Sequence, residues 1–474
     1  MTNPSKAALL VGALLLAGCG GVIPGDGRTG GGGTHSGACQ IGGQAVSGGG
    51  TVSTRGASPT AAPDWQAPRV AGQVLVEDAG GLSAQALRAL STVQTLRLEP
   101  GVLIALTPSG EGDAAFASRL GAAGLRTQPN FLYQPLAVPN DPGYPGNGGV
   151  PVGTGRYDQD YLVRIRAPGA WAALAAAGQD NAGVVTAVLD TGVDAGHPDL
   201  AGRLLPGCSF GARGEVSEGA SEVSADSPQD RGHGTGVAGL IGAATNNALG
   251  VAGVTWQGRN VLPLKVLADD GASTASIRAA LNHAVGRGAK VINMSLGAPG
   301  DFGDQLLKEA LTRAARSAVL VAAAGNTSSQ GIYFPASDPN VIAVGAVGRA
   351  DSLACYSARP GGASGSRQLD IVAPGGNGGT SATVTNDVGP NEARCRVTSE
   401  YDVLTLTARD RGSYTLRLGT SEAAPLVSGV ASLMWAANPG LSAAQVKARL
   451  LGSSRTVNGL KLLDAEAAVK AALR

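Results

Sequence analysis

The sequence has little charge and no long block of one sign. Charged residues make up 15% of its 474 residues, and 36 basic side chains against 35 acidic ones leave a formal net charge of +1. Proteins that bind nucleic acid by neutralising phosphates need concentrated positive charge, so the composition disfavours that class of partner. The 43% of hydrophobic residues is enough for a sizeable core and too much for a chain that is disordered throughout.

Long hydrophobic runs are also scarce. The run from Ala8 to Ala17 holds about ten apolar residues and is too short to cross a bilayer as a helix. Its N-terminal place predicts that residues 1–19 are an export signal. The tetrapeptide that ends it, Leu16-Ala17-Gly18-Cys19, resembles the lipobox of bacterial lipoproteins. The resemblance implies acyl chains on Cys19 that anchor an exported protein at a membrane surface, while a plain secretory signal remains the alternative.

Glycine and proline, in contrast, are abundant, with 73 and 26 residues. No Gly-X-Y period runs through the chain, which excludes collagen. Residues 20–70 are rich in Gly, Ser, Thr and Ala without any apolar period, and this composition predicts a flexible tether. The whole length of 474 residues allows two to three domains of ordinary size.

Cysteines are few. Besides Cys19 the chain has four, and none of them forms a C-x-x-C pair of the zinc-binding kind: Cys39, Cys208, Cys355 and Cys395. Export makes disulfides possible, and four cysteines allow three pairings. We favour Cys355 with Cys395 because both flank one region of the C-terminal part, while free buried thiols remain the alternative.

Residues 71–137 have a pattern of their own. Strand-like and helix-like segments alternate in the order β-α-β-β-α-β, at residues 73–77, 83–91, 96–98, 102–106, 113–125 and 131–133. That order predicts a small ferredoxin-like α+β domain. A proline-rich boundary at residues 138–142 separates it from the long C-terminal part, residues 138–474.

Three short motifs in the C-terminal part carry residues that can do chemistry. Residues 184–190, VVTAVLD, read as a buried parallel strand that ends on Asp190, at the sheet edge where α/β proteins bind ligands. His233 lies between two glycines in RGHGTG and precedes a predicted helix. Ser421 lies in GTSEAAP, which leads into a helix predicted over 426–436, and is expected at the start of that helix. The N–H groups at a helix start can stabilise an oxyanion. Taken singly, each residue has a plain structural explanation: a turn aspartate, a packed histidine, a helix cap.

Taken together, the three motifs occur in the order Asp, His, Ser, which is the order of the subtilisin arrangement. Further segments match the subtilase family in order: NMSLG at 293–297, AAAGN at 322–326, FPA at 334–336 and DIVAPG at 370–375. The C-terminal part therefore resembles a subtilisin-like serine protease (peptidase S8). The resemblance implies an α/β fold with a doubly wound, mostly parallel sheet covered by helices on both faces, and an exported serine endopeptidase.

The resemblance also implies roles for single residues. Ser421 becomes the nucleophile, His233 the general base, Asp190 the residue that orients the imidazole, and Asn326 a donor to the oxyanion. A peptide substrate is expected to add as a strand beside a short segment, and small residues are expected to wall the pocket for the residue before the cleaved bond. These substrate-binding positions are Ser295, Leu296, Gly297, Ala323 and Gly325.

A structural calcium ion is implied as well. Asn247 lies in a loop, residues 245–251, that resembles a calcium loop of the family. Asp199 and Asp141 match carboxylate ligands found in members, and hard oxygen ligands of this kind suit Ca²⁺. A glycine-bounded surface turn without metal is the alternative. No catalytic cofactor is implied.

In this setting residues 71–137 are expected to be a propeptide that assists folding and inhibits until the chain cleaves itself near residues 134–140; a permanent inhibitory domain is the alternative. The expected partners are protein or peptide substrates, the chain's own propeptide and a membrane through Cys19, with no nucleic acid and a monomeric state. The expected location is extracellular or at the cell surface.

The sequence departs from the family pattern at four places. Gly236 and Leu426 stand where histidines are common, which we interpret as differences in packing. Glu422 follows the nucleophile directly, so it either raises the pKa of His233 or is held harmlessly by the helix N-terminus. We expect it to tune the pH profile rather than abolish activity. Residues 376–418 form a longer insertion with a predicted β-hairpin, interpreted as a surface elaboration rather than a wall of the cleft or a part of the body. A silent subtilase-fold binding protein is the competing function. An esterase is disfavoured because the order Asp, His, Ser is not the order of the α/β-hydrolase triad.

Overall fold

The structure is a computed structural model. It describes residues 63–65, 69–77, 83–99, 101–131, 138–222, 232–268, 271–362, 365–376 and 403–474. The expected signal with Cys19, nearly all of the tether, Cys39, Cys395 and residues 134–137 of the expected cleavage region lie outside these residues. Within the described residues, no helix combines the length and the apolar character that crossing a membrane requires.

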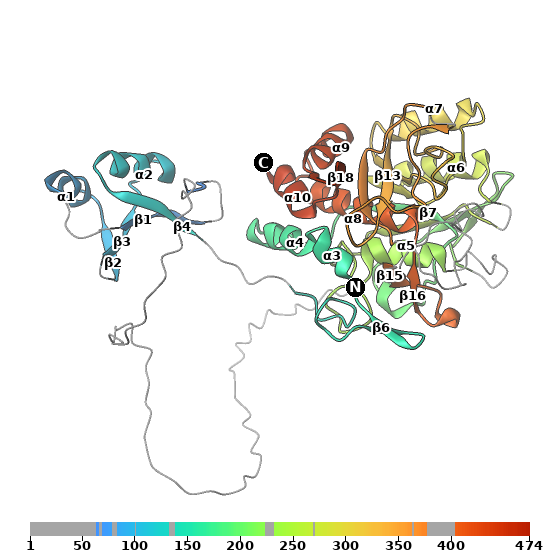
Figure 1. Ribbon diagram of the computed structural model, residues 1–474, viewed down its shortest axis with the longest axis horizontal. Coiled ribbons are helices and arrows are strands. Elements are labelled where there is room, and N and C mark those ends of the chain that lie inside the picture. Colours follow the sequence, from blue (N-terminus) through green and yellow to red (C-terminus); the bar gives the residue numbers. More distant parts are fainter. Residues whose placement is uncertain are drawn as a thin grey trace, which may run out of the picture. The chain divides into compact units, whose positions relative to one another are not determined.

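The described residues between 69 and 131 form a small α/β unit (Figure 1). Its elements are β1 Arg69–Glu77, α1 Ala84–Ser91, β2 Thr95–Glu99, β3 Val102–Leu106, α2 Asp113–Ala122 and β4 Arg126–Phe131. The strands form an antiparallel sheet in the order β2-β3-β1-β4. Val74, Phe116 and Leu120 are fully buried and form its core with their neighbours. The element order is the expected one, although α2 ends three residues before the expected Leu125.

The C-terminal part is built on a ten-stranded sheet in the order β17-β18-β14-β13-β12-β11-β7-β10-β8-β9. Its strands are β7 Thr186–Asp190, β8 Cys208–Phe210, β9 Val216–Glu218, β10 Val261–Lys265, β11 Val291–Met294, β12 Val319–Ala323, β13 Val341–Val347, β14 Ile371–Pro374, β17 Arg455–Val457 and β18 Leu460–Leu462. All neighbours from β8 to β18 in this order pair in parallel. The central strands are buried on both faces, which explains their continuous apolar runs.

Helices cover both faces of this sheet (Figure 1). One face carries α6 Thr274–Gly286 and α7 Gln305–Ala314. The other carries α3 Asp160–Arg164, α4 Ala167–Ala176, α5 His233–Gly242, α8 Thr420–Ala437, α9 Ala443–Gly452 and α10 Ala465–Leu473. The expected doubly wound α/β sheet is confirmed. The paired strands β5 Val150–Val152 and β6 Gly155–Tyr157 were not predicted, because three residues are too few to display a period.

The insertion is not the surface elaboration that the sequence analysis favoured. Its described part holds β15 Val403–Leu406 and β16 Tyr414–Arg417, which form the predicted antiparallel hairpin. Leu404 and Leu406 are fully buried in a core shared with α5. Gly236 explains the close fit, because a Cβ at this position would stand 2.9 Å from the Leu406 carbonyl oxygen. The departure from the family at Gly236 therefore makes room for the hairpin.

Two further differences concern α8 and the cysteines. The helix begins at Thr420, six residues before the expected start, and it contains Pro425. Cys355 is disulfide-bonded, whereas Cys208 is free with its Sγ 3.5 Å from Nε2 of His283. The partner of Cys355 thus lies outside the described residues, as does the favoured candidate Cys395.

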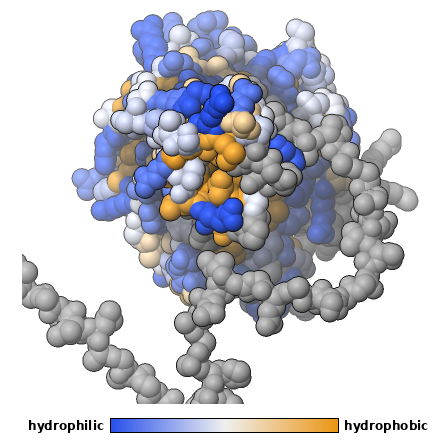
Figure 2. Space-filling model, turned by 90° about the vertical axis from the view of Figure 1, so that its left-hand side faces the viewer, coloured by the Kyte–Doolittle hydropathy of each residue, from blue (hydrophilic) through white to orange (hydrophobic). Residues whose placement is uncertain are grey.

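Apolar side chains also reach the surface. In the small unit, Leu87, Leu96 and Leu98 are each about half exposed. Apolar residues gather inside a polar border on the face that Figure 2 shows.

Candidate active site

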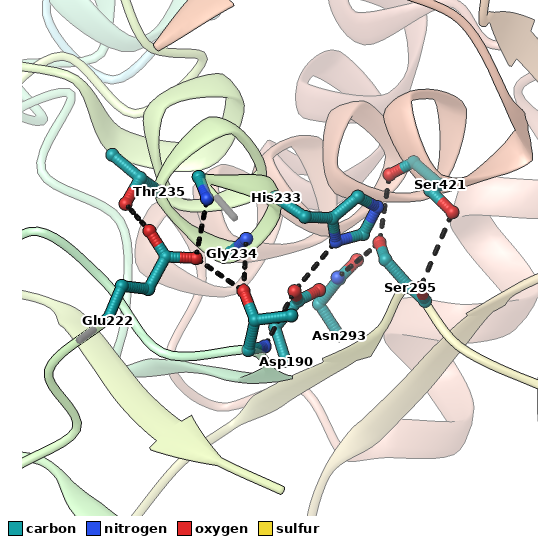
Figure 3. Close-up of polar contacts among 10 residues, drawn as sticks. Asp190, Glu222, His233, Gly234, Thr235, Asn293, Ser295 and Ser421 are labelled. Carbon is teal, nitrogen blue, oxygen red and sulfur yellow. Dashed lines mark hydrogen bonds and ion pairs between the residues drawn. The ribbon is translucent and has the colours of Figure 1, made fainter. Parts of the chain in front are cut away.

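Three elements bring the candidate triad together (Figure 3). Asp190 is the last residue of β7, His233 is the first of α5, and Ser421 is the second of α8. Oδ1 of Asp190 lies 2.7 Å from Nδ1 of His233 and also accepts the N–H of Thr191 at 2.8 Å. In the neutral ring this hydrogen bond places the proton on Nδ1 and leaves Nε2 as the base.

Gly234 permits this contact. A Cβ on Gly234 would stand 2.1 Å from the Gly192 carbonyl oxygen and 3.1 Å from the Asp190 side chain. No other residue fits between the first turn of α5 and the end of β7 without moving backbone atoms. The glycine after the histidine is therefore needed for the Asp190–His233 hydrogen bond.

Ser421 is hydrogen-bonded to Ser295, the residue that follows β11. Pro425 has no N–H to donate to the Ser421 carbonyl four residues earlier, and the Ser295 hydroxyl donates to this carbonyl instead, at 2.8 Å. The Ser421 hydroxyl makes a long bond of 3.4 Å to the Ser295 carbonyl. His233 and Ser421 are only 5% and 8% exposed, and both line one open cavity of about 340 Å³.

Asn326 lines the same cavity with its amide fixed in one orientation. Its Oδ1 accepts the Thr420 N–H at 2.8 Å and the Thr420 hydroxyl at 2.9 Å. A backbone N–H can only donate, so the amide oxygen must face Thr420, and the NH₂ group remains as the donor. An NH₂ group held beside the nucleophile suits an oxyanion hole.

The expected substrate-binding residues all line this cavity: Ser295, Leu296, Gly297, Ala323 and Gly325. Tyr333 also lines it and was not foreseen. A Cβ on Gly325 would stand 2.5 Å from the Tyr333 ring, so the ring covers the small residue closely. The signal for Tyr333 in the sequence is weak, because only folding brings residue 333 onto Gly325.

Glu422 is 1% exposed and lies in the first turn of α8. There the positive end of the helix dipole favours a carboxylate. The expectation that Glu422 tunes the pH profile stays a prediction.

A second buried carboxylate was missed altogether. Glu222 accepts hydrogen bonds from the hydroxyls of Thr191 and Thr235 and from the Gly232 N–H (Figure 3). Burial raises the pKa of Glu222 above its usual value and the Asp190 charge adds to the rise, while the two hydroxyls and Arg417 offset part of it. Glu222 lies eleven residues before His233 and belongs to none of the three motifs, so no local pattern indicated it.

The three expected calcium ligands do lie together. Asn247 Nδ2 lies 3.2 Å from Oδ1 of Asp199, and Asp141 accepts the N–H groups of Asn246 at 2.7 Å and Asn247 at 3.3 Å. Asp141 and Asp199 are fully buried. Burial raises the pKa of both carboxyls, and the Asp199 charge further raises that of Asp141.

The two buried carboxylates are oxygen ligands of the kind that Ca²⁺ prefers. The Asn247 amide oxygen, however, accepts the Leu249 N–H at 2.9 Å while its NH₂ group faces Asp199, so this amide would have to turn to bind an ion. Among the described residues, this loop included, no group of three or more His, Cys, Asp or Glu side chains is placed to hold a metal ion. Tyr414 of the hairpin also reaches the cluster, and its hydroxyl is hydrogen-bonded to Asp199.

Comparison with known proteins agrees with this geometry. The family model of the subtilase family, peptidase S8, matches residues 181–467. Thermitase of Thermoactinomyces vulgaris is 32% identical over 300 residues, which cover 62% of this chain and 88% of thermitase. Subtilisin DY of Bacillus licheniformis is 35% identical over 308 residues, which cover 62% of this chain and 94% of that protein.

Two further matches have different coverage. A thermophilic serine proteinase of a Bacillus species is 34% identical over 65% of this chain, which spans 62% of that protein's length. A solved protease structure from Pseudoalteromonas arctica matches with a TM-score of 0.55 at 29% identity, covering 71% of this chain and all of that one. The chain therefore belongs to the subtilase family and is a subtilisin-like serine endopeptidase.

Proposed function

We propose that the chain hydrolyses internal peptide bonds through Asp190, His233 and Ser421. The observation that carries this proposal is the 2.7 Å contact between Asp190 and His233, made at the edge of the cavity that Ser421 and Asn326 also line. The competing function, a silent binding protein with this fold, leaves the preserved triad and Asn326 without a use.

The mechanism follows from the positions of these groups. Ser421 Oγ turns from the Ser295 carbonyl to His233 and attacks the substrate carbonyl while Nε2 takes its proton. Asp190 stabilises the imidazolium through its bond to Nδ1. The Asn326 NH₂ group and the Ser421 N–H at the start of α8 hold the oxyanion. His233 then protonates the leaving amine, and water releases the acyl group by the same steps in reverse.

The substrate is proposed to bind as an extended strand along Ser295–Gly297. Gly297 follows β11, and the chain pairs again only at Ala298, where two backbone bonds of 2.9 Å join it to Phe334. Main-chain hydrogen bonds would supply affinity, and the space beside Ala323, Gly325 and Tyr333 would supply side-chain preference.

The chain is further proposed to be made as an exported precursor. Residues 71–137 would act as a propeptide, 138–474 as the mature enzyme, and Cys19 as the site of a lipid anchor. The order of elements in the small unit and the apolar N-terminal run support these assignments.

A structural Ca²⁺ is proposed at Asp141, Asp199 and Asn247. The ion would neutralise two carboxylates buried side by side and stabilise the 245–251 loop. No catalytic step depends on it.

A fluorophosphonate probe on the purified full chain tests the catalytic proposal. We expect labelling and self-cleavage near residues 134–140 in the wild-type chain, and neither in Ser421→Ala. The matched control is Ser366→Ala, an exposed serine of the same unit, which should behave as wild type. A folded wild-type chain that stays full-length and unlabelled would favour the silent binding protein.

A further inference from the structure

Glu222 lies against the triad but takes no part in the mechanism given above. It is only 8% exposed, and its backbone N–H bonds to the Val193 carbonyl at 3.2 Å. All three groups bound to its carboxylate are donors: two threonine hydroxyls and one backbone N–H. An ionised carboxylate accepts all three of these bonds at once.

Its partners are the immediate neighbours of the catalytic residues. Thr191 follows Asp190, and Thr235 lies two residues after His233. Gly232 is the N-cap of α5, and its N–H donates to Glu222 at 3.1 Å. One side chain therefore connects the end of the strand that carries Asp190 with the first turn of the helix that carries His233.

The two hydroxyls extend this connection further. Thr191 Oγ1 accepts the Gly234 N–H at 3.0 Å while it donates to Glu222. Thr235 Oγ1 likewise accepts the Asp194 N–H at 2.8 Å while it donates to the other carboxylate oxygen. Loss of the carboxylate would leave both hydroxyls without an acceptor in a buried place.

The charges that face Glu222 come from three elements. Asp190 at the end of β7 is negative, Arg417 of β16 is positive, and His233 in α5 becomes positive during catalysis. The N-terminus of α5 adds a partial positive charge beside the carboxylate. A second fixed negative charge next to Asp190 favours the charged form of the imidazole.

We propose that Glu222 is a positioning residue of the triad, which holds Asp190 and His233 in register and adds negative charge that stabilises the imidazolium. This inference rests on the proposed catalytic function. A merely structural carboxylate would support folding without any influence on the protonation of His233.

The test compares Glu222→Gln and Glu222→Asp in the protein purified from cells that express the full chain. Glutamine keeps the size and removes the charge, so kcat should fall about tenfold with little change in KM. The acidic limb of kcat/KM should shift by about half a pH unit or more to lower pH, because the imidazolium loses a stabilising charge. Aspartate keeps the charge, so its acidic limb should stay in place even if kcat falls.

Glu218→Gln is the matched control, because Glu218 is exposed on the nearby strand β9. It should leave kcat and the pH profile unchanged. Thr235→Val keeps the charge of Glu222 and removes one of its hydroxyl donors, so it should lower kcat without moving the acidic limb. This variant tests the positioning role if Glu222→Gln does not fold.

An acidic limb that stays in place in a folded Glu222→Gln enzyme overturns the inference, and so does an unchanged kcat in Thr235→Val. A wild-type chain that hydrolyses no peptide and takes no fluorophosphonate overturns the proposed function instead. The two failures are therefore distinguishable.

Discussion

Two clusters of buried carboxylates in the catalytic part differ in what donates to them. The triad cluster, Asp190 and Glu222, receives an imidazole ring, two hydroxyls and the backbone N–H groups of Thr191 and Gly232. The loop cluster, Asp141 and Asp199, receives mainly N–H groups of the 245–251 loop. Burial penalises charge in both clusters, so burial alone does not mark a catalytic carboxylate.

The donors make the difference. The His233 ring can take up and release a proton, so its bond to Asp190 serves a reaction. A backbone N–H cannot take up and release a proton in this way, so the bonds to Asp141 and Asp199 hold the loop and carry no catalytic proton. The insertion hairpin touches both clusters, through Arg417 near Glu222 and Tyr414 at Asp199. Matched substitutions in the two clusters should therefore separate activity from stability.

The largest effect is expected for Asp190→Asn. The change keeps the size of the side chain but favours the wrong tautomer of His233, so kcat should fall by about 10⁴. Kinetics on a peptide substrate measure this loss, and thermal unfolding should show little change. Asp141→Asn in the loop cluster is the control and should keep kcat within about a factor of three. Equal losses of activity in the two variants would contradict the claim that only the triad cluster serves catalysis.

Asn326→Ala removes the side-chain NH₂ group that is proposed to donate to the oxyanion. Its loss should lower kcat by about 10²–10³ with little change in KM, because the donor acts in the transition state. Steady-state kinetics measure both constants. A rise in KM at constant kcat would instead assign Asn326 to substrate binding.

Asp199→Asn should act on stability. The loss of one buried carboxylate and its bonds to Val251 and Tyr414 should lower the free energy of unfolding by about 1–3 kcal/mol. With calcium bound, chelation by EDTA should lower the melting temperature of the wild-type protein and have less effect on the variant. Calorimetry with and without Ca²⁺ measures both, and identical EDTA effects in the two proteins would contradict the proposed calcium site.

The smallest effect is expected for Arg409→Ala, which breaks an exposed ion pair between the hairpin and Asp194 at 2.9 Å. Burial raises the pKa of Asp194, but its bonds to Arg409 lower the pKa below its usual value. The pair therefore stabilises the fold above the ordinary pKa of an aspartate, and the contribution is lost as pH falls through the lowered value. Melting curves of wild type and variant should converge at low pH; a gap that widens in acid would contradict this sign.

Much of the fold was predictable from local patterns. The strand predicted over 184–190 is β7, which begins two residues later and ends at the expected Asp190, because a strand buried on both faces is a continuous apolar run. α8 was predicted to begin six residues too late, because Pro425 suggests a helix start. The hairpin was found, but its burial was not, because alternation along a strand does not tell which body covers it.

The sequence alone determined the family, the order of the three catalytic motifs and the candidates Asp190, His233, Ser421 and Asn326, because each lies in a short motif whose residue types suit one chemistry. Only the tertiary structure decided that Glu222 meets Thr191 and Thr235, and that the hairpin fills the space beside Gly236. Such contacts join residues far apart in the chain through backbone positions and packed volumes. A local pattern records a side chain's type and period, and it does not record which distant groups the completed sheet brings to it.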